Sequence, residues 1–305
     1  MAAFDDLMRY QRDTVALEQV AGRLGWDQET MMPKGAGDQR AEEMAAISTV
    51  LHQRRSAAQV GDWLAQITDA DLAPEAQAQL RLILRDYARS TRLPVDLAAE
   101  LARSRSLAHQ RWAEARASED VAHFLPMLAH MIDLKRQEGA ALAADSGISP
   151  YDALLQDYEP GATSAQLEAM FGALRPRLVA LRDACFGASH GPAPLQGQFD
   201  EAGQLALSRS LAVAFGYDLS RGRIDKAVHP FSSGSGDDVR ITTRTNPGDP
   251  FNCFYSTIHE VGHAAYEQGI NPAYRLTPLG QGVSMGVHES QSRIYENQLG
   301  RCAAF

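Results

Sequence analysis

The sequence has few cysteines, few positive charges and no long apolar run. Its 305 residues include three cysteines, too few and too widely spaced for a disulfide framework or a thiolate metal cluster, so we expect them to serve as small apolar packing residues. Lys and Arg total 29 against 38 Asp and Glu, and the net charge of -9 argues against nucleic acid or anionic lipid as a partner. No run of about 18 apolar residues occurs, so a transmembrane helix is not expected.

The N terminus also lacks the features of a secretory signal. Asp5 and Asp6 stand where a signal peptide carries positive charge, and no uninterrupted apolar segment follows them. The sequence therefore predicts a protein that stays in the cytoplasm, where its cysteines remain reduced. With 45% hydrophobic and 22% charged residues, it has enough apolar surface for a folded core.

Amphipathic helix patterns fill residues 1–180. Apolar residues recur at i, i+3, i+4 and i+7, the spacing of one helix face, and we interpret each set as a buried core stripe. Before the third set, Thr163 and Gln166 have the spacing of a capping box. The sets are Leu80, Ile83, Leu84 and Tyr87; Phe124, Met127, Leu128 and Met131; and Leu167, Met170, Phe171, Leu174 and Leu178.

The second half of the chain contains a loop, a short strand and a long helix. Residues 187–198 are rich in Gly and Pro and form a possible subdomain boundary. Apolar and polar residues alternate over 238–243, which predicts a strand. Asp249 is a good N-cap, Pro250 suits the first helical position, and Gly269 is a natural end for the helix that follows. The expected fold class is therefore mainly α with a small β element near 238–243.

The most specific chemical pattern is H-E-x-x-H at residues 259–263, within that expected helix. His259 and His263 project from one helix face about one turn apart, so both imidazoles can reach one zinc ion at roughly 2.0 to 2.1 Å. Glu260 lies beside the ion, in the position of a general base. Small and apolar neighbours predict that this helix is buried, where unpaired His and Glu side chains would be costly.

A catalytic zinc site needs a third protein ligand. Glu267 lies on the same helix face but about 12 Å along the axis from His259, too far to share one ion easily. A carboxylate on the next helix is the better candidate, with Glu289 as the first choice and Glu296 as the second. Taken alone, Glu289 also fits an ordinary surface ion pair with Arg293 at i+4.

Five separate segments resemble the carboxypeptidase Taq family of metallocarboxypeptidases. Residues 259–263 are similar to its H-E-x-x-H motif, 288–291 to its H-E-S-Q signature and 238–242 to its D-x-R-x-T signature, and residues 26–33 and 151–160 are also similar to family sequence. In the family, the glutamate of H-E-S-Q is the third zinc ligand. The resemblance therefore implies that Glu289 holds the metal and that the fold is a groove-containing helical metallopeptidase fold.

The resemblance covers the whole chain but only about three fifths of the family domain. Two downstream family signatures, G-x-x-Q-D-x-H-W and I-R-x-x-A-D, are absent from it. Residues 1–305 are thus expected to form one catalytic domain that is incomplete at its C terminus, with part of the substrate groove missing.

The function implied by the resemblance is that of a zinc-dependent carboxypeptidase, which removes C-terminal amino acids from peptides. The metal ligands are His259, His263 and Glu289, and Glu260 is the catalytic base. The family also implies a homodimer and a site that accepts cobalt. Two alternatives stay open: a zinc oligopeptidase or endopeptidase, and a truncated, catalytically weak or inactive chain that binds metal or pairs with another subunit.

The free carboxylate of such a substrate needs a cation, for which arginine is well suited. Arg240 is the candidate in this chain, and a structural ion pair with Asp238 or Glu267 is the equal alternative. His229 could supply an oxyanion donor, although a solvated loop position is the simpler interpretation. The other histidines have no ligand spacing, and surface or capping roles are expected for His52, His109, His123, His130 and His190.

Overall fold

The computed structural model describes residues 2–68, 72–189, 191, 193 and 195–305, and most of these residues are helical. The principal helices are α1 (Ala2–Thr30), α2 (Gly37–Arg55), α3 (Ala58–Gln66), α4 (Pro74–Arg92), α5 (Val95–Ser118), α6 (Val121–Ala143), α7 (Pro150–Leu155), α8 (Ser164–Phe186), α9 (Glu201–Ala214), α10 (Pro250–Gly269) and α11 (Met285–Arg293). Short helical turns are η1 (Lys34–Ala36), η3 (Pro272–Tyr274) and the π-helical η4 (Ile294–Leu299). The expected mainly α fold class is confirmed.

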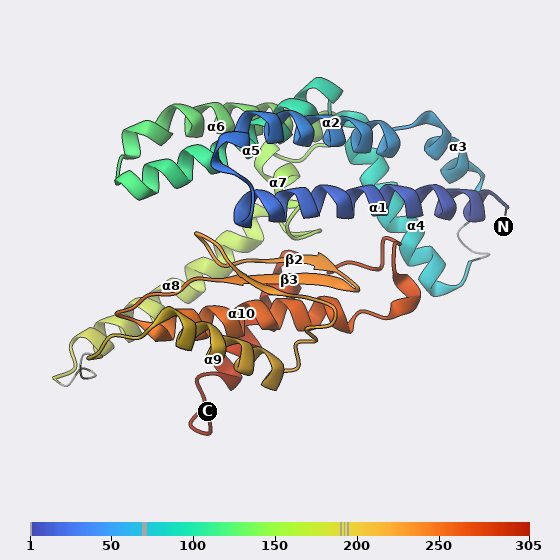
Figure 1. The fold of residues 1–305 in the computed structure, drawn as a ribbon. Coiled ribbons are helices and arrows are strands. Elements are labelled where there is room, and N and C mark those ends of the chain that lie inside the picture. The colour runs from blue at the N-terminus through green and yellow to red at the C-terminus, as the bar shows by residue number, and fades with distance from the viewer. Residues whose placement is uncertain (1, 69–71, 190, 192, 194) are drawn as a thin grey trace.

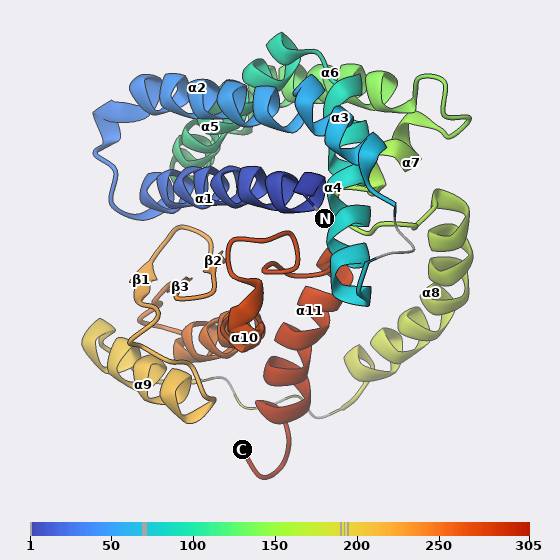
Figure 2. The same cartoon turned by 90° about the vertical axis from the view of Figure 1, so that its right-hand side faces the viewer.

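The helices form two layers around a small sheet. Figure 1 shows α1, α2, α5 and α6 above the sheet, with α9 and α10 below it. The upper layer touches the sheet through α1, because Gln19 Nε2 donates to Ser235 Oγ at 3.1 Å and Arg23 pairs with Asp238 at 2.9 Å. Figure 2 shows α11 rising beside α10, while α8 runs along the outside of the molecule.

The sheet consists of β1 (Ile224–Lys226), β2 (Ser232–Ser235) and β3 (Asp238–Thr243), in the order β1-β3-β2. The central strand β3 pairs in parallel with β1 and antiparallel with β2. Gly234 has φ of 96°, a backbone conformation that glycine adopts without steric cost, just before the tight connection from β2 to β3. The strand predicted over 238–243 is confirmed.

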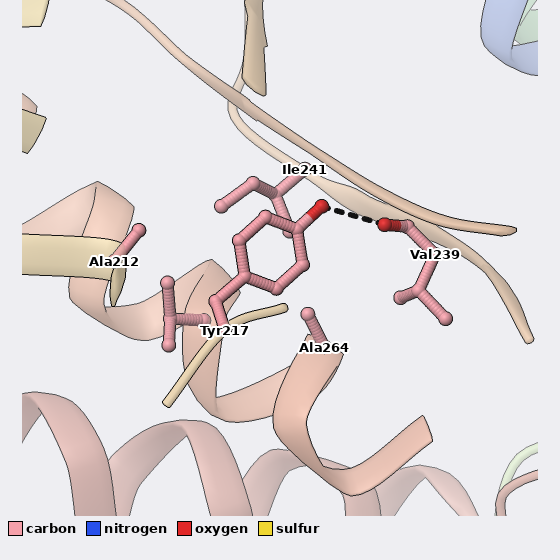
Figure 3. Close-up of a cluster of buried hydrophobic side chains, with 6 residues drawn as sticks. Ala212, Tyr217, Val239, Ile241 and Ala264 are labelled. Carbon is pink, nitrogen blue, oxygen red and sulfur yellow. Dashed lines mark hydrogen bonds between the residues drawn. The ribbon is translucent and has the colours of Figure 1, made fainter. Parts of the chain in front are cut away.

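The core beneath the sheet joins β3 to α9 and α10. Its buried members are Ala212, Tyr217, Val239, Ile241, Val261 and Ala264. Figure 3 shows the Tyr217 ring between β3 and α10, with its hydroxyl donating to the Val239 carbonyl at 2.6 Å. Helix α10 begins and ends as predicted, and Asp249 caps it by accepting from the Asn252 N–H. This packing anchors the helix that carries the H-E-x-x-H motif.

A second core lies under α1, α3 and α4, where Leu7, Val60, Leu80 and Ile83 are buried. The first predicted apolar stripe is therefore confirmed at Leu80 and Ile83, whereas Leu84 is exposed. The prediction that the stripe on α8 is buried is wrong, because none of the described residues of α8 is buried. The capping box of Thr163 and Gln166 is confirmed. Helix α8 forms as predicted, but it packs against no other described element extensively.

The stripe on α6 and the cysteines also differ from expectation. Met127 and Met131 are only half-buried and Leu128 is exposed, so this stripe does not form a closed core. Cys253 is buried, as expected of a small packing residue, but Cys185 and Cys302 are exposed free thiols. Among the described helices, none combines the length and the apolar character needed to cross a bilayer.

Candidate metal centre

Helix α10 presents its two histidines to a cleft while its opposite face packs on the sheet. The His259 and His263 rings lie with their centroids 4.9 Å apart, as expected for neighbours one turn apart. The helix face behind them is fixed by Ile258, Val261 and Ala264, which are all fully buried. The apolar residues within and beside the motif therefore set the direction in which its imidazoles point.

Helix α11 brings Glu289 to the same place. Its Oε2 atom lies 3.6 Å from His259 Nε2 and 3.3 Å from His263 Nε2. The two helices can approach because residue 262 is glycine: a Cβ there would lie 2.6 Å from the Ser292 Cα atom. One ligand atom from each of the three side chains lies within 4.8 Å of the others.

These three side chains have the donor chemistry of a zinc site. Two imidazole nitrogens and one carboxylate oxygen are typical ligands of catalytic zinc, which keeps a further position open for water or substrate. The three residues are half-buried, so a metal there would be shielded by protein yet reachable from the cleft. The residues therefore fit the metal that the sequence predicts.

Glu260 stands beside this group and is only 5% exposed. Burial, together with the negative charges of Glu289 and Glu296, raises the pKa of Glu260 to about 8. Three carboxylates this close repel one another, and a divalent cation among them would relieve that repulsion. A cation bound there would therefore lower the pKa of Glu260 and favour its carboxylate form.

Two of the three candidate ligands, His263 and Glu289, have charge states that suit metal ligation. Burial, reinforced by His288 and His259, lowers the pKa of His263 to about 4, so its imidazole is neutral near pH 7. Burial alone would raise the pKa of Glu289, but His259, Ser292 and Arg293 outweigh it and lower that pKa. A neutral imidazole and an ionised carboxylate are the forms that bind metal.

Glu296 lies behind His259 and outside the group of ligand atoms. Its Oε2 atom is 2.9 Å from His259 Nδ1, the ring nitrogen opposite to the one that faces Glu289. Arg301 and Arg293 also bind its carboxylate, at 2.9 and 3.1 Å. Of the two carboxylates considered for the third ligand, the geometry brings Glu289 to both histidines and gives Glu296 a supporting contact.

His288 touches His263 and Glu267 touches His288, and neither contact was predicted. His288 Nδ1 lies 2.6 Å from His263 Nδ1, and His288 Nε2 lies 2.9 Å from Glu267 Oε1. The distance of Glu267 from His259 along the helix argued against a direct ligand role for it. Its position one turn beyond His263 was nevertheless a signal that it could act behind that residue.

The candidate centre opens into a cleft of about 940 Å³. One wall is α1, with Arg23 and Trp26, and the opposite wall includes β2 and the face of α10. Arg240 lines this cleft and donates through Nε and Nη2 to Asp238 at 2.7 and 2.9 Å, while its guanidinium lies 4.5 Å from the Trp26 ring centroid. The predicted alternative of an ion pair with Asp238 thus describes the contacts of Arg240 in this structure.

Of the remaining histidines, His229 lines the cleft. His109, His123 and His130 pair with acidic side chains, in keeping with structural roles. His52 is buried, so a surface role for it is wrong, but it does lie in the last turn of α2. His190 lies outside the described residues.

The chain is similar to a known family of proteins. Residues 6–305 match the family described as carboxypeptidase Taq (M32) metallopeptidase. The chain belongs to this family. The resemblance inferred from five sequence segments is therefore confirmed.

Relatives from several organisms are similar over most or all of the chain. Thermostable carboxypeptidase 1 of Thermus thermophilus is 38% identical, with all of this chain and 62% of the relative covered. Carboxypeptidase 1 of Bacillus subtilis is 33% identical, with 91% and 56% covered.

Solved structures have the same fold. A crystal structure of BsuCP superposes with a TM-score of 0.95 at 29% identity, covering 99% of this chain and 61% of that one. The M32 carboxypeptidase of Deinococcus radiodurans R1 gives a TM-score of 0.85 at 35% identity, covering 99% and 61%. The chain therefore spans about three fifths of the length of the relatives that it matches.

Proposed function

We propose that this chain is the catalytic part of a zinc-dependent carboxypeptidase that removes C-terminal amino acids from peptides. The observation that carries the proposal is the convergence of His259 Nε2, His263 Nε2 and Glu289 Oε2 beside the buried Glu260, in a cleft of a member of this family. The carboxypeptidase names of the relatives support the reaction class.

The metal would be held by His259, His263 and Glu289. Bound zinc supplies a Lewis acid that polarises a carbonyl oxygen and makes water a stronger nucleophile at neutral pH. The Glu260 carboxylate takes the proton of the attacking water and then delivers it to the leaving amine. The burial of Glu260 keeps bulk water from competing for that proton. Cobalt is a workable substitute for zinc, because imidazole and carboxylate ligands also suit Co²⁺.

The substrate's free carboxylate needs a cation in the same cleft, and Arg240 is the group that we propose. Trp26 and Asp238 hold its guanidinium in place, so it would meet a carboxylate without first being ordered. Arg240→Gln should then raise KM for peptides with a free C terminus and leave kcat less affected. An equal loss on peptides with an amidated C terminus would assign Arg240 a structural role.

Two experiments test the reaction itself. The first compares hydrolysis of one peptide with a free and with an amidated C terminus. A strong preference for the free acid supports a carboxypeptidase, and equal rates would instead identify an oligopeptidase or endopeptidase.

The second experiment compares wild-type protein with Glu260→Gln, which should keep its zinc and lose its activity. A metal-loaded but inactive wild-type chain would support the alternative of a metal-binding homologue without catalysis.

We further propose that residues 1–305 act as one catalytic unit, because the cleft is lined by both α1 and α10. The resemblance implies a homodimer, the sequence predicts the cytoplasm, and the three free cysteines fit a reducing compartment. Light scattering on the purified chain tests the dimer directly, since a mass of one chain would contradict it.

A further inference from the structure

Each of the two histidines on α10 has one ring nitrogen facing Glu289 and the other facing a polar side chain behind it. His263 shows this most clearly: its Nε2 is 3.3 Å from Glu289 Oε2, and its Nδ1 is 2.6 Å from Nδ1 of His288. Two ring nitrogens at hydrogen-bond distance require that one carries a proton and the other does not. The direction of this hydrogen bond therefore decides whether His263 Nε2 has a free lone pair.

Glu267 sets the direction. Its Oε1 atom lies 2.9 Å from His288 Nε2 and also accepts the backbone N–H of Gly282 at 3.2 Å. A carboxylate only accepts, so a neutral His288 carries its one proton on Nε2 and its Nδ1 is the acceptor. His263 must then donate from Nδ1, which leaves Nε2 unprotonated and facing Glu289. The opposite direction would put the proton of neutral His263 on Nε2 and close that atom to a metal.

The fold holds His288 in this orientation. The Tyr266 ring packs edge-on against it, with centroids 5.0 Å apart. Gly282 passes close to both partners, because a Cβ there would lie 2.5 Å from His288 Cδ2 and 3.2 Å from Glu267 Oε1. Glu267 is 7% exposed, and its Oε2 atom has no hydrogen-bond partner among the described residues. A buried carboxylate that uses one oxygen for His288 and the adjoining loop is well placed to orient that ring.

His259 has a similar arrangement, but a carboxylate contacts its ring directly. Glu296 Oε2 lies 2.9 Å from His259 Nδ1, and Arg293 and Arg301 hold the Glu296 carboxylate. His259 therefore donates from Nδ1 and keeps Nε2 free, as His263 does. The two histidines differ in that one contacts a carboxylate directly and the other through an intervening imidazole.

We propose that His288 and Glu267 form a positioning relay that holds the proton of His263 on Nδ1, with Glu296 doing the same for His259, so that both Nε2 atoms are ready to bind a metal. The inference rests on the proposed function only for the identity of the metal. His288 and Glu267 do not touch the ion in this account; they act through His263. Partners of this kind are worth roughly 10- to 100-fold in metal affinity.

The test uses His288→Phe and His288→Asn in the full chain. Phenylalanine keeps a ring in the space but accepts no hydrogen bond, whereas the asparagine carbonyl oxygen can stand in for Nδ1 as acceptor. Zinc affinity, measured by competition with a chromophoric chelator, should fall about 10- to 100-fold in His288→Phe and be largely restored in His288→Asn. His130→Phe, a change of a histidine bound to Glu100 on the surface, is the matched control and should bind zinc as wild type does.

A second readout needs no metal. Nitrogen-15 chemical shifts of the imidazole rings report which nitrogen is protonated, and wild-type His263 and His259 should both carry the proton on Nδ1. His288→Phe should move only His263 toward the Nε2-protonated form. Should His288→Phe fail to fold, Glu267→Gln is the milder variant, and it should give the same shift at smaller amplitude because the amide is a weaker acceptor than the carboxylate.

The outcomes separate this inference from the proposed function. A wild-type chain that binds no zinc but shows both protons on Nδ1 would overturn the proposed function and leave the relay standing. A wild-type chain that binds zinc, with unchanged affinity and an unchanged His263 tautomer in His288→Phe, would overturn the relay.

Discussion

Helices α8 and α10 are similar in length and both carry regularly spaced apolar residues, yet their surroundings differ completely. Nine residues of α10 are buried among the sheet, α9 and α11, whereas none of the described residues of α8 is buried. Apolar spacing therefore identifies the face of a helix that can be covered, while the neighbouring elements decide whether it is covered. In this chain the covered helix is the one that holds the candidate metal ligands.

The largest expected difference between the two helices is in the cost of removing an apolar side chain. Ile258→Ala in α10 should lower the free energy of unfolding by about 2–5 kcal/mol, because Ile258 is fully buried and the change leaves a cavity. Leu174→Ala in α8 should change it by about 0.5 kcal/mol or less, since Leu174 is 44% exposed. Urea unfolding of both variants checks this, and equal losses would show that α8 is covered in solution.

Zinc should stabilise the protein through α10 and α11 alone. At a free zinc concentration 100 times the dissociation constant, the gain is about 2.7 kcal/mol, and a chelator should remove it. Thermal unfolding with and without zinc should show the gain in wild-type protein and in Leu174→Ala. It should be strongly reduced in Glu289→Gln, where one ligand is lost; an undiminished gain in that variant would place the metal elsewhere.

Replacing one glycine by alanine in each helix should change the free energy of unfolding in opposite directions. Gly262→Ala should lower the free energy of unfolding by about 1–3 kcal/mol and weaken zinc binding. Its Cβ would meet the backbone of Ser292 and Gln291 and push α11 away. Gly172→Ala in α8 should stabilise by about 0.5–1 kcal/mol, since a Cβ there meets no described atom within 4 Å and alanine favours the helix. Chemical unfolding measures both, and a stabilised Gly262→Ala protein would contradict the close packing of α10 on α11.

The smallest expected effect concerns pH. The hydrogen bond from Arg240 lowers the pKa of Asp238 from its ordinary 3.8, burial opposes this, and Arg23 adds to the lowering. A lowered folded-state pKa gives stability that is complete above the ordinary pKa and is lost as the pH falls through the lowered one. The melting temperature should thus decline below about pH 4 more steeply in wild-type protein than in Asp238→Asn.

The control for this prediction lies on α8. Asp183→Asn removes a carboxylate whose partner Arg182 is its exposed neighbour in sequence, so the pH dependence of the melting temperature should stay as in wild type. A flattened profile in Asp183→Asn, or an unchanged one in Asp238→Asn, would contradict the assignment of the effect to the contacts of Asp238 with Arg240 and Arg23.

The features that were predicted correctly depend on neighbouring residues in the sequence. Asp249 and Pro250 start α10, Thr163 and Gln166 cap α8, and alternation marks β3, all of which are short-range patterns. The H-E-x-x-H spacing likewise predicts two imidazoles on one helix face.

The features that were missed or left open depend on elements far apart in the sequence. Spacing alone left Glu289 and Glu296 as competing ligands, because the choice depends on how α11 packs against α10 at Gly262. The contact of Glu267 with His288 spans 21 residues and requires the loop at Gly282 to fold back over both. The exposure of α8 was missed for the same reason, since its own sequence does not say which elements lie nearby.

The central claim is that His259, His263 and Glu289 bind one metal ion. Isothermal titration of metal-free protein with zinc tests it most directly, with Glu289→Gln as the variant and Glu296→Gln as the matched carboxylate control. The account predicts one ion per chain, at least a tenfold loss of affinity in Glu289→Gln, and a smaller loss in Glu296→Gln, which changes a partner of His259 and not a ligand. Zinc binding that survives unchanged in Glu289→Gln, or that is lost more completely in Glu296→Gln, would contradict it.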